Sequence, residues 1–225
     1  QEMLDKKYTK EFKERAKVWK NLPVYSRVTD FLELFDTNDV VVLESGTGSG
    51  KSVLIPEMCV YYFDYSKRVV MTVPKQLLAS GAAQYASSRL DSPIGKKIGY
   101  RFRGSDEKFF NAEENIYETT TDGSLLARLL RDQNLSDYSC VIIDEAHERK
   151  ANIDFLLLFI GSAIKNRKET KNPLKLVIMS ATIDTSLFRN YFGNEKLNVG
   201  HITISGETTL FKVSERFIPH PIKDQ

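Results

Sequence analysis

Hydrophobic residues in this chain gather in two kinds of segment, and the alternation of the two predicts the fold. Short, nearly continuous apolar runs are typical of strands that are buried on both faces of a parallel sheet. Such runs predict strands at residues 40–44, 68–73, 97–102, 115–119, 140–143, 174–179 and 202–205.

Longer segments between these runs carry apolar residues three and four positions apart, a spacing that is typical of helices. They predict helices at residues 26–35, 52–63, 76–89, 123–131, 152–164 and 185–191. Strands that alternate with helices predict an α/β fold, with a mainly parallel sheet and helices on both of its faces. Ligands of such sheets bind beyond the carboxyl ends of the strands.

Residues 1–20 form a distinct, basic amphipathic segment. Tyr8, Phe12, Ala16 and Trp19 recur at helical spacing, and Asn21-Leu-Pro23 ends the pattern. We expect a peripheral helix that packs through its aromatic stripe, and an arm that grips nucleic acid is the alternative.

Composition narrows the class of protein. The 225 residues suffice for one large domain, or for one domain with an appendage. A net charge of +2 only mildly favours a polyanionic partner. Cys59 and Cys140 lack metal-ligand spacing and are typical of reduced core residues in an intracellular protein, nuclear or cytoplasmic. The longest apolar run, 155–160, is too short to cross a membrane, so no membrane partner is expected.

A glycine-rich segment, Ser45-Gly-Thr-Gly-Ser-Gly-Lys-Ser52, follows the first predicted strand and precedes a predicted helix. This order is the pattern of a phosphate-binding loop, with Ser45 in place of the usual first glycine. Backbone N–H groups and the helix N-terminus favour an anion there, whereas a glycine-rich turn without a ligand is the alternative. Lys51 is expected to reach the β- and γ-phosphates, and the Ser52 hydroxyl to bind Mg²⁺. The residues expected to bind nucleotide in this loop are Gly46, Thr47, Gly48, Ser49, Gly50, Lys51 and Ser52.

The apolar run at 140–143 leads directly into Asp144-Glu-Ala-His147. A phosphate-binding loop needs a partner carboxylate for Mg²⁺ at the end of a neighbouring strand, and Asp144 fits this role through a metal-bound water. Glu145 is the candidate base for the water that attacks the γ-phosphate. His147 is a candidate for a hydrogen bond to another segment. A helix cap at the strand end is the alternative, which the loop at Lys51 disfavours.

Several segments together resemble the DEAH-box family of superfamily 2 helicases. Motifs I, II and III are resembled, in this order, by Gly-Ser-Gly-Lys-Ser52, Asp144-Glu-Ala-His147 and Ser180-Ala-Thr182. Leu22-Pro-Val-Tyr25 resembles the family's segment before motif I, and Thr72-Val-Pro-Lys-Gln76 resembles its motif Ia. Gly99-Tyr-Arg-Phe-Arg103 resembles the hook segment, and Thr120-Thr-Asp-Gly-Ser-Leu-Leu126 resembles motif Ib. Unusual residues inside these motifs indicate a divergent member, with a viral source as one candidate.

The resemblance implies a RecA-like P-loop NTPase domain that uses ATP or another NTP with Mg²⁺. It implies an N-terminal helix at 1–22, the first RecA-like domain at 23–208 and the start of a crossover at 209–225. Lys51, Asp144, Glu145 and His147 would form the catalytic set, and Ser180 and Thr182 would link the nucleotide site to a nucleic-acid site. The residues that would line an RNA path are Lys75, Arg101, Phe102, Arg103, Thr121 and Asp122. A solvated surface is the alternative for the basic ones.

The sequence departs from the family pattern in motif Ia and at the residue that stacks on the nucleotide base. Val73, Lys75 and Gln76 replace the usual glutamine and arginines, which implies altered backbone contacts. Tyr85 falls near the place of an arginine that stacks on the base in the family, and it either stacks likewise or belongs to the core. Loose selectivity among nucleoside triphosphates is therefore expected.

The family places the nucleotide between two RecA-like domains, and arginines of the second stabilise the transferring phosphoryl group. Because the chain begins at Gln1 and stops as the crossover begins, we expect a piece of a longer protein with little activity of its own. A DNA helicase or translocase is the alternative to an RNA helicase. A non-catalytic nucleotide-binding scaffold is a third reading, which the complete set of Lys51, Asp144 and Glu145 disfavours.

Overall fold

The structure is a computed structural model that describes residues 14, 17–148, 150–181 and 185–205. Within them, seven strands form one sheet in the order β3-β4-β2-β5-β6-β1-β7, and every strand pairing is parallel. The strands are β1 (Val40–Ser45), β2 (Val69–Val73), β3 (Ile98–Tyr100), β4 (Tyr117–Thr121), β5 (Cys140–Ile143), β6 (Lys175–Ser180) and β7 (Val199–Ile204).

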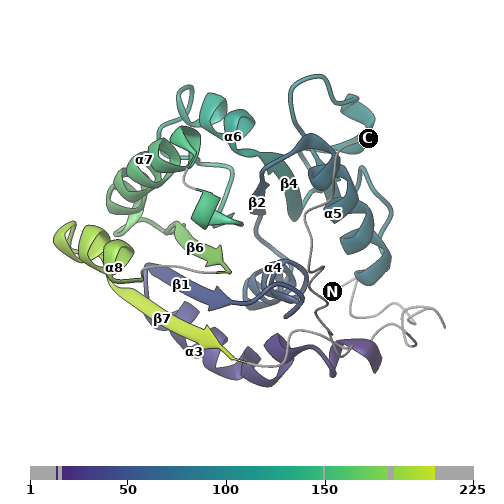
Figure 1. The fold of residues 1–225 in the computed structure, drawn as a ribbon. Coiled ribbons are helices and arrows are strands. Elements are labelled where there is room, and N and C mark those ends of the chain that lie inside the picture. Colours follow the sequence, from purple (N-terminus) through teal and green to yellow (C-terminus); the bar gives the residue numbers. More distant parts are fainter. Residues whose placement is uncertain (1–13, 15–16, 149, 182–184, 206–225) are drawn as a thin grey trace, which may run out of the picture.

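Helices cover both faces of this sheet (Figure 1). One face carries α3 (Val28–Thr37), α4 (Lys51–Tyr62) and α5 (Gln76–Arg89). The other carries α6 (Asp122–Leu129), α7 (Ala151–Arg167) and α8 (Thr185–Asn194). Three short 3₁₀ helices complete the described elements: η1 (Pro23–Arg27), η2 (Glu107–Phe109) and η3 (Ala146–Glu148).

Alternate strand residues feed two separate cores. Side chains along a strand point to opposite faces of the sheet. In β1, Val41 and Leu43 join the core under α3, α4 and α5, whereas Val40 and Val42 join the core under α6, α7 and α8. All four are buried. Burial on both faces is why the strands are continuous apolar runs, and it confirms the predicted parallel α/β fold.

All seven predicted strands are present, and the predicted helices are present with small shifts of their ends. β7 begins at Val199, earlier than predicted, because its pairing with β1 already starts there. The predicted helix at 26–35 is preceded by η1, and η2 was not predicted. Most of the N-terminal segment, and all of 209–225, lie outside the described residues.

Parallel pairing brings the carboxyl ends of the strands to one edge of the sheet. β1, which ends at the glycine-rich segment, lies beside β6, where Glu44 pairs with Ser180. β5, which ends before Asp144, lies between β6 and β2. The motifs are therefore neighbours in space although they are far apart in sequence. Among the described helices, none combines the length and the apolar character needed to span a membrane.

Candidate functional site

The glycine-rich loop connects the end of β1 to α4, which begins at Lys51. Gly50 has φ +89°, a left-handed backbone that favours glycine. A Cβ atom at Gly50 would lie 2.8 Å from Cδ1 of Leu22, so the segment before η1 packs directly on the loop. The Val24 N–H donates to the carbonyl of Ser49 over 3.1 Å and holds this contact. The loop is thus shaped by its own glycines and supported from outside.

Ser45 explains the departure at the first position of the loop. Its hydroxyl hydrogen-bonds the Ser49 hydroxyl across the loop, and both residues are buried. A buried hydroxyl needs a partner, and here each side chain supplies one for the other. Glycine at position 45 would lack this bond.

Lys51 and the residues after β5 meet at the mouth of the loop. The Lys51 side chain is buried, and its Nζ lies 3.9 Å from Oε1 of Glu145. Burial raises the pKa of Asp144 to about 6, against the lowering effect of a hydrogen bond with Ser52 and of the Lys51 charge, while Glu145 raises it further. The contact between Asp144 and Ser52 brings together the two groups predicted to hold Mg²⁺.

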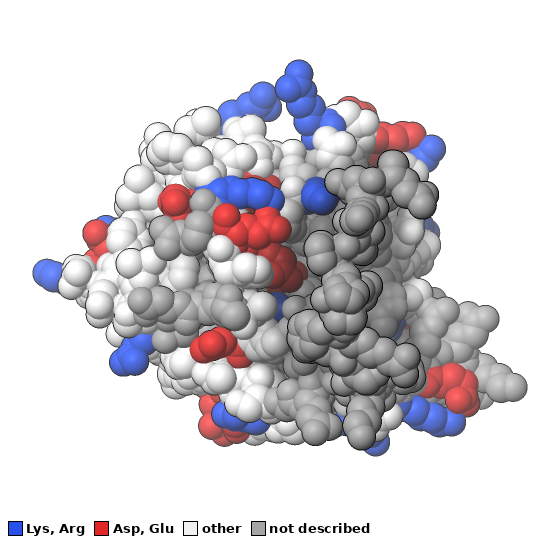
Figure 2. Space-filling model, in the orientation of Figure 1, with Lys and Arg blue, Asp and Glu red and all other residues white. Residues whose placement is uncertain are grey.

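These two oxygen donors fit a magnesium site. Mg²⁺ in nucleotide sites commonly takes only one or two protein oxygens, with phosphates and waters filling the remaining positions. The Ser52 hydroxyl and the Asp144 carboxylate, which line the same cavity at the start of α4, match that donor set. In Figure 2, acidic side chains gather near the centre of the face, in the part of the view where β1 and β6 end in Figure 1.

Glu145 has an unusual backbone for a candidate base. Its φ is +53°, a left-handed conformation that costs a non-glycine residue roughly 1 kcal/mol or more. Its N–H donates to Oδ1 of Asp144 over 2.9 Å. Its Oε2 lies 3.3 Å from Nδ1 of His147. The turn therefore directs the Glu145 carboxylate between Lys51 and His147.

His147 extends this series of contacts to β6. Its Nδ1 lies 3.2 Å from the Ser180 hydroxyl, which is fully buried. The predicted hydrogen bond from His147 to another segment thus has a partner in motif III. Thr182, the other predicted coupling residue, and Arg149, which follows motif II, lie outside the described residues.

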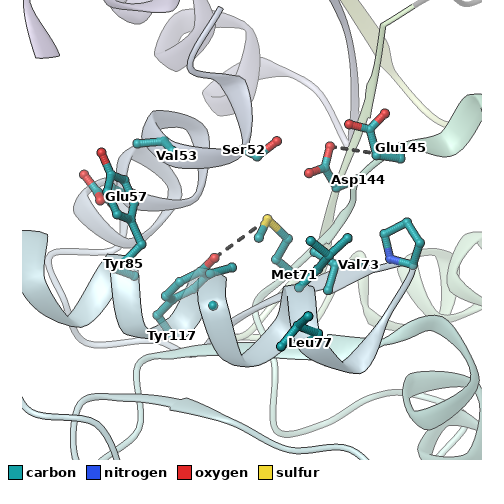
Figure 3. A pocket seen from close by; sticks show the side chains of 15 residues that line it. Ser52, Val53, Glu57, Met71, Val73, Leu77, Tyr85, Tyr117, Asp144 and Glu145 are labelled. Atoms are coloured by element: carbon teal, nitrogen blue, oxygen red, sulfur yellow. Dashed lines mark hydrogen bonds between the residues drawn. The ribbon is translucent and has the colours of Figure 1, made fainter. Parts of the chain in front are cut away.

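A cavity of about 390 Å³ adjoins this cluster between α4 and α5 (Figure 3). Ser52, Asp144 and Glu145 line one part of it, and its other walls are mostly apolar, with Met71 and Val73 from β2. Tyr85 also lines it and is 51% exposed, which excludes the core alternative for this residue. A planar apolar group such as a nucleobase could pack here.

The Tyr85 wall is supported by a buried ion pair. The Arg89 guanidinium lies 5.5 Å from the Tyr85 ring centroid and 4.2 Å from that of Trp19, in the N-terminal segment. Arg89 Nη2 donates to Glu57 Oε2 over 2.7 Å, and Arg89 is fully buried. Burial raises the pKa of Glu57 to about 7, although the Arg89 charge and hydrogen bond lower it. Sequence analysis missed this pair, because its partners lie on different helices, 32 positions apart.

A second, basic groove of about 660 Å³ lies beyond the ends of β3 and β4, beside the start of α5 and along α6. Arg101, Phe102, Arg103 and Thr121, four of the residues that the family resemblance assigns to an RNA path, line it together. The segment that carries them is anchored, since Gln76 Nε2 donates to the Arg103 carbonyl over 3.2 Å. None of the described residues that line the groove is acidic.

Two predicted nucleic-acid contacts differ in the structure. Asp122 is only 4% exposed and does not line the groove, so its side chain is not placed for the predicted direct contact with RNA. It starts α6 with its carboxylate turned inward, and burial raises its pKa. Lys75 is exposed just before α5 but does not line the groove either. The groove also includes four polar residues that were not predicted: Gln76, Ser124, Arg128 and Arg131.

Comparison with known proteins identifies the family of the chain. The sequence model of the DEAD/DEAH box helicase family matches residues 29–189. The chain belongs to the DEAD/DEAH box helicase family. This confirms the predicted family, and the seven-stranded parallel sheet agrees with a RecA-like helicase domain.

Several relatives in this helicase family carry RNA helicase names. "Putative ATP-dependent RNA helicase L540" of Acanthamoeba polyphaga mimivirus is 38% identical over 215 residues, 96% of this chain and 30% of that protein. The ATP-dependent RNA helicase HrpA of Escherichia coli is 36% identical over 88% of this chain and 14% of its own length. Human ATP-dependent RNA helicase DHX33 is 37% identical over 77% of this chain and 24% of its own length. The chain therefore spans less than a third of these DEAD/DEAH relatives.

Proposed function

We propose that this chain is the NTP-binding half of an NTP-dependent RNA helicase, which couples NTP hydrolysis to movement along RNA or to its unwinding. The observation that carries the proposal is the series of contacts from Lys51 through Glu145 and His147 to Ser180. This series joins the phosphate loop to motifs II and III, beside a pocket of suitable size. The names of the relatives support RNA as the polymer.

The chain's own residues would bind and orient the triphosphate. Loop N–H groups and Lys51 would hold the β- and γ-phosphates. Ser52 would bind Mg²⁺ directly and Asp144 through water, and the ion, when bound, would neutralise charge that develops on the phosphates. Glu145, held by its left-handed turn, would accept the proton of the attacking water. His147 and Ser180 would relate the state of this site to motif III.

The base would lie against Tyr85 and the apolar wall of the cavity. No glutamine among the described residues lines this cavity, so the chain offers the base stacking and apolar contact with little hydrogen-bond readout. We infer loose selectivity among nucleotides. Comparable turnover of ATP, GTP, CTP and UTP would support it, whereas a preference above about tenfold for one base would contradict it.

A second RecA-like domain in the same parent protein would complete the nucleotide site. On this proposal, the isolated chain binds nucleotide weakly and hydrolyses it poorly, because it lacks the arginines that a second domain supplies. RNA-stimulated turnover by the isolated chain close to that of the full-length protein would contradict this part of the proposal.

The decisive experiment replaces the candidate base in the full-length protein. Glu145→Gln should lower NTP turnover by about 10²–10⁴-fold, the usual contribution of a general base, while nucleotide affinity stays within about twofold. Glu148→Gln is the matched control, because Glu148 lies three residues on and its carboxylate pairs with Lys150 at the surface. Unchanged turnover in Glu145→Gln would reject Glu145 as the base. Stronger stimulation by single-stranded DNA than by RNA would favour a DNA helicase or translocase.

A further inference from the structure

Beneath the basic groove lies a fully buried carboxylate. Glu118, the second residue of β4, has a side chain that is 0% exposed. A buried carboxylate is costly unless charges and hydrogen bonds compensate it. Arg128 Nη1 lies 2.5 Å from its Oε1, and the Tyr138 hydroxyl donates to its Oε2 over 2.7 Å. Nε and Nη2 of Arg101 approach the two carboxylate oxygens at 3.4 Å each. Four elements of the chain therefore meet at one carboxylate.

The two arginines that pair with Glu118 also form the wall of the groove. Their side chains are 38% exposed for Arg101 and 20% exposed for Arg128. Both line the groove, so each guanidinium has one side on the buried carboxylate and the other toward solvent. The Arg101 guanidinium also lies 4.0 Å from the ring centroid of Phe110, which restricts its movement.

The same network fixes the backbone of the hook segment. Arg128 Nη2 donates to the Arg101 carbonyl and to Oγ1 of Thr120, each over 2.7 Å. The Thr120 hydroxyl donates to the same carbonyl over 2.5 Å. The position of Arg101 relative to α6 thus depends on Arg128, and the position of Arg128 depends on Glu118. Neither arginine is a freely moving surface side chain.

The charges add up to a surplus of positive charge at the groove. Two guanidinium groups share one carboxylate, and Arg103 and Arg131 add further positive charge to the wall. Guanidinium groups suit phosphate because they donate two parallel hydrogen bonds in a fixed geometry. Such donors gain most when their orientation is set before the ligand arrives.

We propose that Glu118 is a positioning residue for RNA: it holds Arg101 and Arg128 in the orientation in which both donate to backbone phosphates in the groove. Arg128 thereby becomes a phosphate-binding residue in addition to the predicted set. This role rests on the proposed RNA-binding function of the groove. It acts through the two arginines, since Glu118 itself is out of reach of any ligand.

The sign of a charge change separates positioning from simple electrostatics. A carboxylate beneath a phosphate-binding groove weakens the attraction of RNA through its charge alone. Glu118→Gln removes that negative charge with almost no change of shape. If charge alone mattered, this variant would bind RNA more tightly than the wild-type protein. If Glu118 positions the arginines, the variant binds more weakly despite its more positive groove.

The experiment measures the affinity of the full-length protein for a single-stranded oligouridine RNA at several salt concentrations. Glu118→Gln should bind about 5- to 10-fold more weakly, and the slope of log affinity against log salt should decrease by about 1 as one phosphate contact is lost. Glu107→Gln is the matched control, because it removes the same charge from an exposed residue and should stay within about twofold. Equal or tighter binding by Glu118→Gln, with an unchanged slope, would overturn the positioning role.

Two further measurements keep the outcome clear if Glu118→Gln folds poorly. Tyr138→Phe keeps every charge and removes only the hydroxyl that bonds Glu118, Arg101 and Arg128. It should weaken RNA binding by about two- to threefold and lower the melting temperature by only about 2–6 °C, so that the variant stays folded at about 25 °C. Unchanged RNA binding in Tyr138→Phe would count against the network. Absence of RNA binding by the wild-type protein would overturn the proposed function of the groove and this role with it, a result distinct from an effect on Glu118 alone.

Discussion

The proposed nucleotide pocket and the basic groove each rest on a buried glutamate, but the two glutamates are compensated differently. At the wall of the pocket, Arg89 is the one charged partner of Glu57 among the described residues, and both side chains are almost completely buried. Beneath the groove, Glu118 pairs with Arg101, Arg128 and the Tyr138 hydroxyl, and both arginines reach the surface. The first arrangement closes on itself, whereas the second retains positive charge for a ligand.

This difference shows how one kind of ion pair can serve two purposes. A one-to-one pair that is almost completely buried contributes shape, here the support of the Tyr85 wall, and depends on both partners being present. A carboxylate shared by two part-exposed guanidinium groups tolerates the loss of one more easily, because the other remains. Stability should therefore be more sensitive at the pocket, and ligand affinity more sensitive at the groove.

The largest effect is expected when the one-to-one pair is broken. Arg89→Met leaves the Glu57 carboxylate buried without its partner and should lower the free energy of unfolding by about 3–5 kcal/mol. Arg128→Met is the matched variant at the groove and should cost about 1–2 kcal/mol, because Arg101 and Tyr138 still compensate Glu118. Urea unfolding of the two variants beside the wild-type chain measures both values. Equal losses would show that the two arrangements do not differ as argued.

A pH effect of similar size is expected at the pocket. The pKa of Glu57 is about 7 in the folded chain, raised by burial from its ordinary 4.5. Because the folded state binds this proton more tightly, Glu57 contributes stability that is fully present below about pH 4.5 and is lost as the pH rises to about 7, up to about 3 kcal/mol.

The measurement is the difference in free energy of unfolding between the wild-type chain and Glu57→Gln from pH 4.5 to 8. This difference should shift in favour of the Gln variant as the pH rises, since the glutamine does not titrate. At the groove, by contrast, the Tyr138 phenol contributes no pH dependence in this range, because burial raises its pKa to about 12. A pH-independent difference would place Glu57 in its charged form throughout, with Arg89 outweighing burial.

The two regions also differ in how far the sequence predicts them. The phosphate loop and Asp144 follow from short local patterns, because glycines and a strand end fix where Lys51, Ser52 and Asp144 lie. For Tyr85 the sequence allowed two roles, stacking on the base or burial in the core, since the sequence of α5 does not show which side of the helix borders a cavity. Asp122 was assigned to the RNA path from its place in a motif, which specifies position but not the direction of the side chain.

The network at Glu118 was beyond sequence reasoning for a different reason. Arg128 lies 10 positions from Glu118, on α6. Arg101 lies 17 positions away, just after β3, and Tyr138 lies 20 positions away, just before β5. Their meeting depends on the pairing of β3 with β4 and on where α6 lies over the sheet. No local spacing encodes that arrangement, whereas each motif proposed to bind phosphate is contiguous in sequence.

A change confined to the phosphate loop should separate the two regions functionally. Lys51→Ala removes the buried ammonium that lies at the mouth of the loop and should lower nucleotide affinity by about 100-fold, as expected for the loss of about 3 kcal/mol of charge-assisted hydrogen bonds. Affinity for RNA without nucleotide should stay within about twofold, and Lys67→Ala, at an exposed position, is the control. Fluorescent nucleotide titration and RNA binding on the same samples test this. A parallel loss of RNA affinity would mean that the loop supports the groove directly.

The smallest effect is expected at the edge of the groove. Arg131 lines the groove wall, three residues beyond Arg128 and just after the end of α6, and it is exposed. An exposed arginine that contacts one phosphate contributes affinity without reading sequence, so Arg131→Ala should weaken RNA binding by about two- to fivefold for every sequence tested and lower the salt slope by about 1. Stability and nucleotide affinity should not change, because Arg131 has no part in the Glu118 network. A loss as large as that in Glu118→Gln would show that affinity depends on the total positive charge of the groove, and the orientation that Glu118 imposes would then count for little.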